Sequence, residues 1–186
     1  METSFYSDME LAQIYFKNIG YNVHISRKAS IYSPESVEIG SNVRIDDFCI
    51  LSGHILIGNN IHIAAYSALY GGNASIQISD FANISSRVCI YAISDDYSGE
   101  TMTNPTIPDR YKKIQSEPVL IGKHVIIGSG STVLPGVTLA EGTAVGAMSL
   151  CKNSTEPWKI YAGIPAKVIK ERKQNLLNLE KEYINE

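Results

Sequence analysis

The chain has 186 residues, of which 44% are hydrophobic, and its 16 Lys and Arg against 19 Asp and Glu give a net charge of −3. This length and composition predict one domain with a continuous core, and the charge argues against a nucleic-acid-binding surface. No run of about eighteen apolar residues occurs, and the N-terminus lacks the pattern of a secretory signal. We therefore expect a soluble, cytoplasmic protein without a membrane span.

The three cysteines, Cys49, Cys89 and Cys151, lie far apart in the sequence. Their spacing fits neither a disulfide scaffold nor a metal site of the CxxC type, so reduced structural thiols are expected. No pair of the four histidines has metal-ligand spacing. The sequence therefore predicts no metal site.

Residues 7–19 have the pattern of a short amphipathic helix. Ser7 and Glu10 have the spacing of a capping box, and Leu11 and Ile14 would lie on one apolar face. We expect this helix to cover the open end of the β-structure that follows, because an uncovered end would expose unpaired strand edges.

Aliphatic residues recur every six positions through most of the chain. A period of six matches neither the period of about 2.0 of a strand nor that of about 3.6 of a helix, so each unit must contain a short strand and a turn. Turns of a β-sandwich, the alternative, recur about every 8 to 12 residues. The repeat is typical of a parallel β-helix, here of roughly six coils. Its first positions are Ile25, Ile31, Val37, Ile39, Ile45, Leu51, Ile57, Ile63, Leu69, Ile78, Ile84, Ile90, Ile121, Ile127, Val133, Leu139 and Val145.

Side chains at the fifth position of each unit are predicted to point inward beside those at the first. They are often small or aliphatic, as at Val43, Cys49 and Ser131. The repeat stops after Ile90 and returns only at Ile121, and tyrosines, prolines and acids replace it. A long loop on a rigid solenoid is usually functional, so this segment is the first place to look for chemistry.

After the repeats the chain continues into an extension that ends in a mostly polar helix with Leu176, Leu177, Leu179 and Ile184 on its apolar side. The predicted fold is all-β. A single domain, 1–186, would comprise an N-terminal helical cap (1–24), a β-helix (25–156) with a loop (91–118), and a C-terminal extension with a helix (157–186).

The run of hexads, the single long loop and the ending YAGIPAKVIKER resemble the hexapeptide-repeat acyltransferases, in the branch of sugar acetyltransferases. The stretches SDDYSGETMTNPTIP and GAMSLCKNSTEPWKIYAGIPAK are most similar to enzymes that acylate amino groups of deoxy-sugar nucleotides, with galactoside O-acetyltransferases as relatives. This resemblance implies a left-handed coil, against the usual right-handed crossover rule. It also implies a homotrimer with active sites between subunits and acetyl-CoA as the acyl donor.

By position in these motifs, the resemblance implies six cofactor-binding residues. Lys123, Ala147, Cys151 and Lys152 would line the pantetheine arm, and Lys167 and Lys170 would face the nucleotide phosphates. The alternative for each lysine is a solvated corner or helix position.

Acyl transfer from a thioester needs a nucleophile, a base and donors for the oxyanion. The family usually supplies a loop histidine as the base, but Asp95 stands at that position here and residues 91–120 contain no histidine. Without this histidine, acyl transfer to a weakly acidic sugar hydroxyl would be slow. An amine of the α-amino type titrates near about 8, so a useful fraction is neutral and a carboxylate can accept its proton. We therefore predict an amino acceptor, with Asp95 and Asp96 as catalytic residues and Glu100 beside them. The alternative is a solvated acidic turn.

Three other side chains are candidates for binding the sugar or its phosphates, and a fourth is predicted to occupy a turn. Ser85, just before the loop, and Tyr97 within it can hydrogen-bond the substrate, although packing or exposure explains both equally well. His62 points outward from a flat face, where a neighbouring subunit could bring it into the cleft. His124 falls at a corner position and is predicted to be a turn residue.

The leading prediction is a trimeric enzyme that acetylates the amino group of a nucleotide-linked deoxy-amino sugar, such as dTDP-4-amino-4,6-dideoxyglucose, for surface polysaccharides such as the O-antigen of lipopolysaccharide. A galactoside-type O-acetyltransferase is the first alternative, and it would need His62 in the cleft. A non-catalytic trimeric scaffold is the second. Acyl groups longer than acetyl are compatible with the same motifs.

Overall fold

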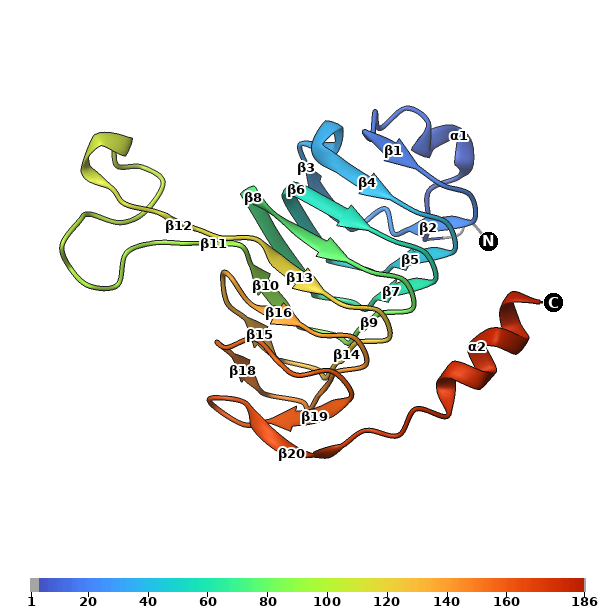
Figure 1. The fold of residues 1–186 in the computed structure, drawn as a ribbon. Coiled ribbons are helices and arrows are strands. Elements are labelled where there is room, and N and C mark those ends of the chain that lie inside the picture. Colours follow the sequence, from blue (N-terminus) through green and yellow to red (C-terminus); the bar gives the residue numbers. More distant parts are fainter. Residues whose placement is uncertain (1–3, 186) are drawn as a thin grey trace.

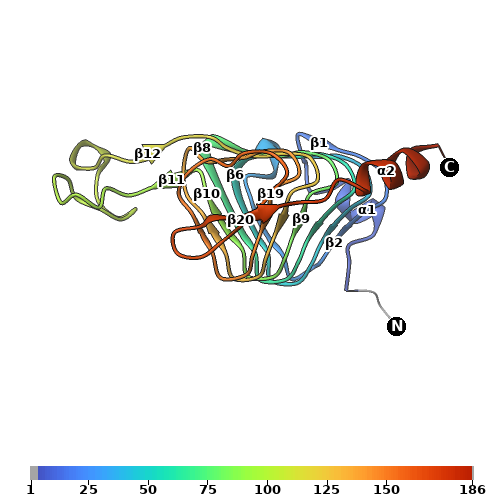
Figure 2. The same ribbon diagram turned by 60° about the horizontal axis from the view of Figure 1, so that its bottom comes forward.

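The chain winds into a left-handed parallel β-helix of about 7 turns, close to the six predicted (Figure 1). A computed structural model describes residues 4–185; residues 1–3 and 186, the outermost positions of the predicted domain, lie outside the described part. Figure 2, with the C-terminal end of the stack brought forward, shows the coils superposed behind the last strands.

Two sheets form the three faces of the stack. The larger sheet covers two faces, because its strands β6 and β8 continue around a corner with register shifts near Gly53. It contains β1 (Asn18–Ile19), β3 (Ser30–Tyr32), β4 (Val37–Ile39), β6 (Ile50–Ile57), β8 (Ala68–Ile78), β10 (Cys89–Tyr91), β13 (Val119–Ile121), β15 (Thr132–Val133), β16 (Thr138–Leu139) and β18 (Leu150–Cys151).

The second sheet forms the remaining face, and its strands pair in parallel except for the last two. It contains β2 (Val23–Ile25), β5 (Val43–Ile45), β7 (Ile61–Ile63), β9 (Asn83–Ile84), β14 (Ile126–Ile127), β17 (Ala144–Val145), β19 (Lys159–Ala162) and β20 (Lys167–Glu171). Short 3₁₀ turns occur at Pro34–Ser36 and Asp109–Tyr111.

The core follows the six-residue repeat. All the predicted first positions are buried except Ile31, which packs against the core while remaining half-buried. The fifth-position side chains of Val43, Cys49 and Ser131 are buried as predicted. Residues between these positions on each strand therefore face outward, and they supply the functional surfaces.

The N-terminal helix is shorter than predicted. Helix α1 (Asp8–Leu11) begins after Ser7, whose backbone N–H donates to Glu10 Oε2 at 2.8 Å as the capping box predicts. The predicted range 7–19 is wrong beyond Leu11, because Tyr15 has a positive φ of 47° and the chain turns to pair β1 with β4. Tertiary pairing thus overrides the local helical pattern.

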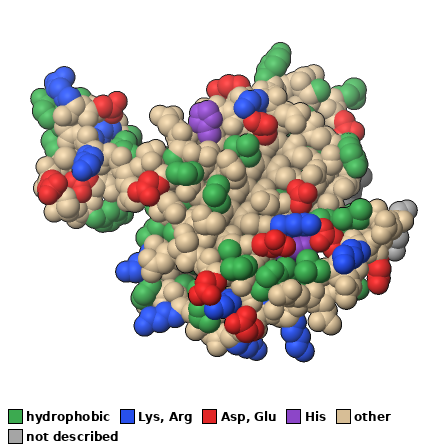
Figure 3. All heavy atoms as spheres, viewed as in Figure 1, with side chains coloured by type: hydrophobic (Ala, Val, Ile, Leu, Met, Phe, Trp, Pro, Cys, Tyr) green, Lys and Arg blue, Asp and Glu red, His purple; other side chains and the backbone are tan. Residues whose placement is uncertain are grey.

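The predicted loop leaves the stack as an arm. Strands β11 (Ile93–Ser94) and β12 (Gln115–Ser116) pair antiparallel at its base, and Met102 bridges to Lys112 further out. Figure 3 shows the arm projecting from the body with side chains of both charges on its surface. We call residues 93–116 the arm.

Helix α2 (Leu176–Ile184) follows β20 and lies beside the corner of the stack where β13 leads into β14. It begins near the position predicted from its apolar side. Within residues 4–185, no helix is long and apolar enough to cross a membrane.

Candidate functional site

A cavity of about 1050 Å³ opens where the arm leaves the stack. Three of the predicted site residues, Asp95, Tyr97 and Lys152, line it together with Tyr70 of β8 and residues at the base of the arm. Asp95 and Tyr97 come from the start of the arm, and Lys152 follows β18 on the coil below. The fold thus brings residues far apart in sequence to one hollow surface.

The wall of this cavity is aromatic and cationic. The rings of Tyr70 and Tyr91 stack with centroids 5.1 Å apart, and burial raises the pKa of Tyr91. The side chain of Lys112, only 7% exposed, pairs with Asp109 at 3.1 Å. Stacked rings suit a planar or sugar ring, and ammonium groups suit phosphates. A nucleotide sugar matches this chemistry.

The two neighbouring aspartates of the arm have different surroundings. Asp96 accepts hydrogen bonds from the backbone N–H of Ser98 at 2.8 Å and from the N–H and hydroxyl of Thr101 at 3.0 and 2.8 Å. These bonds, led by those from Ser98, hold the pKa of Asp96 well below its usual range. Asp96 therefore organises the turn, while the Asp95 side chain lines the cavity.

The remaining arm candidates lie on the outer surface. Tyr97 is 93% exposed although it borders the cavity. Glu100 is exposed, and its backbone N–H donates to Ser98 Oγ at 3.2 Å. Neither side chain is oriented by a hydrogen bond from another residue of the described chain.

Ser85 lies on a different flank, immediately after β9 in the second sheet. Its side chain faces outward because Ile84 before it is buried. Its neighbours on the next two coils are Gly128 and Gly146, so no side chain crowds it there. The Ser85 hydroxyl has no hydrogen-bond partner within residues 4–185 and is available to a ligand.

His62 occupies the same face, two coils toward the N-terminus from β14. Its Nε2 lies 2.8 Å from Asp46 Oδ2, and the Arg44 Nε–H donates to Asp46 Oδ1 at 2.7 Å. Burial acts to raise the pKa of Asp46, but the hydrogen bonds from Arg44 and His62 outweigh it and lower this pKa. The His62 side chain therefore faces outward, as predicted. It is already paired with the Asp46 carboxylate, which fixes its orientation.

The predicted cofactor residues lie at three different corners of the stack. Lys123 lies between β13 and β14, Ala147 between β17 and β18, and Lys152 after β18. Because the coil has three faces, these positions share no single surface of one copy. Lys123 is also engaged by an ion pair with Glu180 of α2.

The other cofactor candidates differ in accessibility. Cys151 is 1% exposed inside the coil, and burial raises its pKa to about 11, so this position offers a ligand only its backbone. Lys167 and Lys170 are exposed on β20 at the C-terminal end of the stack. Within residues 4–185, no group of three or more His, Cys, Asp or Glu is arranged to hold a metal ion.

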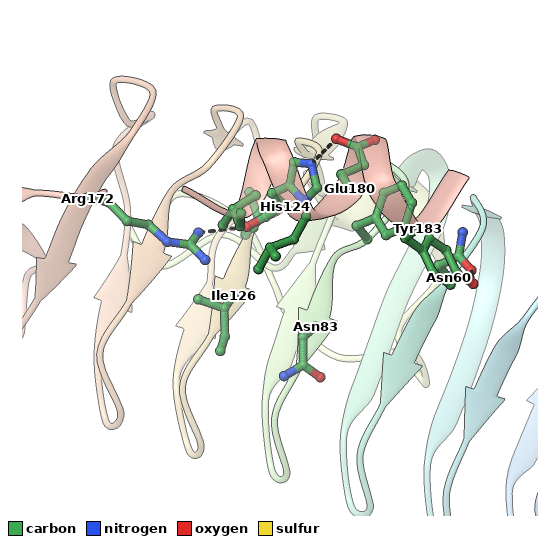
Figure 4. Close-up of a pocket in the computed structure, with 11 residues that line it drawn as sticks. Asn60, Asn83, His124, Ile126, Arg172, Glu180 and Tyr183 are labelled. Carbon is green, nitrogen blue, oxygen red and sulfur yellow. Dashed lines mark hydrogen bonds and ion pairs between the residues drawn. The ribbon is translucent and has the colours of Figure 1, made fainter. Parts of the chain in front are cut away.

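A second cavity, of about 440 Å³, lies between α2 and the stack (Figure 4). His124 occupies the corner there with a positive φ of 59°, as expected of a turn residue. It is also 7% exposed, stacked on Phe81, and 2.8 Å from Glu180 Oε2. Figure 4 shows the side chains of His124 and Glu180 pointing toward one another, joined by this contact. No local sequence signal predicts this contact, because its partners stand 56 residues apart.

Comparisons with known proteins place the chain in a family. No protein-family model matches it. It is 51% identical over 180 residues to a dTDP-4-amino-4,6-dideoxy-D-glucose acyltransferase of Escherichia coli, covering 95% of this chain and 93% of that protein.

Solved structures agree with this relationship. AntD, an N-acyltransferase from Bacillus cereus solved with dTDP and 3-hydroxybutyryl-CoA, superposes with a TM-score of 0.97 at 53% identity, covering 99% of this chain and 98% of that one. Galactoside acetyltransferase in complex with coenzyme A shares the fold, with a TM-score of 0.62 at 21% identity over 91% of this chain and 74% of that one. The chain therefore belongs to the hexapeptide-repeat sugar acyltransferases, as its sequence predicted.

Proposed function

We propose that this protein transfers an acyl group from acetyl-CoA to the 4-amino group of dTDP-4-amino-4,6-dideoxyglucose, as a cytoplasmic homotrimer with active sites between neighbouring copies. The observation that carries the proposal is Asp95 in the arm-base cavity, in a chain that is 51% identical to an acyltransferase named for this sugar nucleotide. AntD has also been solved with the same sugar nucleotide and coenzyme A.

Asp95 acts as the group that binds and deprotonates the amine. The amine nitrogen bonds to the thioester carbonyl carbon, the C–S bond breaks, and CoA leaves. The proton lost by the nitrogen passes to the Asp95 carboxylate, directly or through water, and then to the departing sulfur. A carboxylate suffices because a useful fraction of a sugar amine is neutral near pH 7, unlike a hydroxyl, which needs a stronger base.

Ser85 is the second group of the site. Its free hydroxyl faces a strip containing Gly128 and Gly146, where the pantetheine arm can approach the backbone closely. The hydroxyl can donate to the oxygen of the thioester carbonyl as negative charge develops on it. AntD was solved as variants of one serine and one aspartate that stand ten residues apart, as Ser85 and Asp95 do.

The positions of these two groups support an assembly in which neighbouring copies share each site. Ser85 belongs to the second sheet, whereas Asp95 follows β11 at the base of the arm, which leaves the stack from the larger sheet. In Figure 1, β9 and β11 are on opposite sides of the stack. Both can act on one substrate when the arm of one copy meets the second sheet of its neighbour. In a closed ring of three copies, the arm of every copy meets the second sheet of its neighbour.

One observation favours a second function, a sugar O-acetyltransferase. His62 is oriented by Asp46 as a general base would be, and it shares a face with Ser85. In that reaction His62 would take the proton of a sugar hydroxyl, and Asp95 would have only a supporting role.

The acceptor decides between these functions. We would measure release of CoA thiol from acetyl-CoA with dTDP- and UDP-linked 3-amino and 4-amino deoxysugars and with simple galactosides, and identify the products by mass spectrometry. Efficient turnover of dTDP-4-amino-4,6-dideoxyglucose alone is the expected result. Turnover of a galactoside alone would refute N-acylation and identify the O-acetyl function instead.

A further inference from the structure

The groove between α2 and the second sheet is apolar with one free polar group at its floor. Asn83 of β9 and Ile126 of β14 are register partners on neighbouring parallel strands, and they form the floor of the groove (Figure 4). Leu176 and Leu179 of α2 form the opposite wall. Such a lining, mostly hydrophobic with few polar groups, is typical of a small-ligand pocket.

The wall is held in place at both ends of α2. Before the helix, Arg172 Nη1–H donates to the His124 carbonyl oxygen at 2.7 Å. Within it, Glu180 lies 2.8 Å from His124 Nε2, and near its end the Tyr183 hydroxyl donates to Asn60 Oδ1 at 3.1 Å. The groove therefore has a defined width.

Ser85 stands two residues along the chain from Asn83, which lines the groove. Asn83 and Ser85 are outward-facing residues of one strand segment with the buried Ile84 between them, about 6.6 Å apart along the chain. Within residues 4–185, neither side chain has a hydrogen-bond partner. The Asn83 amide can both donate and accept, so it can bind a hydroxyl.

We propose that this groove binds the acyl chain of the thioester, accepts chains longer than acetyl, and recognises a 3-hydroxyl group through Asn83. The inference rests on the proposed function, in which Ser85 lies at the reacting carbonyl. Carbons beyond a 3-hydroxybutyryl carbonyl extend about 4 Å, so the hydroxyl reaches Asn83 and the terminal methyl meets Ile126 and Leu176. AntD has been solved with 3-hydroxybutyryl-CoA, a donor of this shape.

The test compares acetyl-, butyryl- and 3-hydroxybutyryl-CoA as donors to dTDP-4-amino-4,6-dideoxyglucose. Wild-type protein should use 3-hydroxybutyryl-CoA at least as well as acetyl-CoA. Leu176→Trp, which fills the groove, should lower the kcat/KM ratio of 3-hydroxybutyryl- to acetyl-CoA about tenfold or more, and Asn83→Ala should lower the ratio of 3-hydroxybutyryl- to butyryl-CoA about tenfold. Lys181→Trp, on the same helix but outside the groove, should leave both ratios at their wild-type values.

The kcat/KM ratios between donors test the acyl groove separately from the proposed function on which it rests. No thiol release from any of the three donors contradicts the proposed function, and with it this inference. Acetyl transfer by a wild-type protein that rejects the longer donors overturns the acyl groove alone, as do unchanged ratios in both groove variants. If Leu176→Trp loses all activity because α2 is displaced, the Asn83→Ala ratio decides.

Discussion

Asp95 and Asp96 show how adjacent side chains of one type take different roles. The oxygens of Asp96 accept three hydrogen bonds within the arm, whereas Asp95 borders the cavity that also contains Lys112 and Lys152. The sequence predicted both as catalytic, because spacing alone does not show which carboxylate a turn will use. Asp96 is engaged in the turn of the arm, and we propose Asp95 as the residue that takes part in the chemistry.

Replacing Asp95 tests this assignment. Asp95→Asn keeps the size of the side chain but removes the proton acceptor, so kcat/KM with the amino sugar should fall about 100-fold or more. His62→Ala should cost much less, because His62 takes no proton in N-acylation. Steady-state thiol release from both variants gives the ranking, with thermal unfolding as a check on folding. The reverse ranking would support the hydroxyl acceptor.

Two of the three cysteines are protected by the coil. Cys49 and Cys151 are buried, and desolvation raises the pKa of each thiol to about 11. Because the thiolate is the reactive form, neither should react with a disulfide reagent such as DTNB in the native protein at about pH 8. Unfolding in guanidinium chloride should make all three reactive. Rapid modification of Cys49 or Cys151 in the folded protein, seen by mass spectrometry, would contradict this burial.

Among the elements, the coils were predictable from sequence and the docking of α2 was not. Each hexad places its own strand, since an aliphatic residue such as Ile127 or Leu139 points inward whatever lies far away in the chain. Helix α2 was recognised from its apolar residues. Its position was not, because it depends on contacts of Glu180 with Lys123 and His124, which no local pattern encodes. For the same reason the groove beneath it was missed.

The anchoring of α2 by Glu180 predicts a response to pH. The Lys123 ammonium and then His124 lower the pKa of Glu180 from its ordinary value of 4.5. A lowered carboxyl pKa stabilises the folded arrangement fully above pH 4.5, and that contribution is lost as the pH falls through the lowered value. Acidification through the lowered pKa of Glu180 should therefore loosen α2, whereas the helix should stay docked at neutral pH.

Glu180→Ala should loosen α2 already at neutral pH. We expect limited proteolysis to cleave residues 173–185 faster in this variant than in wild type, while the coils resist. Glu182→Ala removes a neighbouring exposed acid of the same helix and serves as the control. Equal cleavage of Glu180→Ala and wild type would show that other contacts, such as Tyr183 with Asn60, suffice to hold the helix.

At the scale of the whole molecule, the proposed site draws on Ser85 of the second sheet and Asp95 at the base of the arm, and we propose that neighbouring copies bring them together. The sequence correctly indicated the fold and the family, and it selected Ser85 and Asp95 as candidates. It could not show that Ser85 follows a strand of the second sheet while Asp95 lines the cavity at the base of the arm, because that depends on which face each coil presents. In the proposed trimer, the different positions of these two groups would explain why the chemistry needs two copies at each site.

Mixing two inactive variants tests this claim most directly. Ser85→Ala and Asp95→Asn would each be purified alone and shown to have little activity, then coexpressed with different tags and purified through both. If each site takes Ser85 from one copy and Asp95 from its neighbour, every trimer that contains both variants has one complete site among its three, and thiol release should return to about one third of wild type. Mixed oligomers that stay as inactive as the separate variants would show that both residues act from the same copy, and would contradict the account.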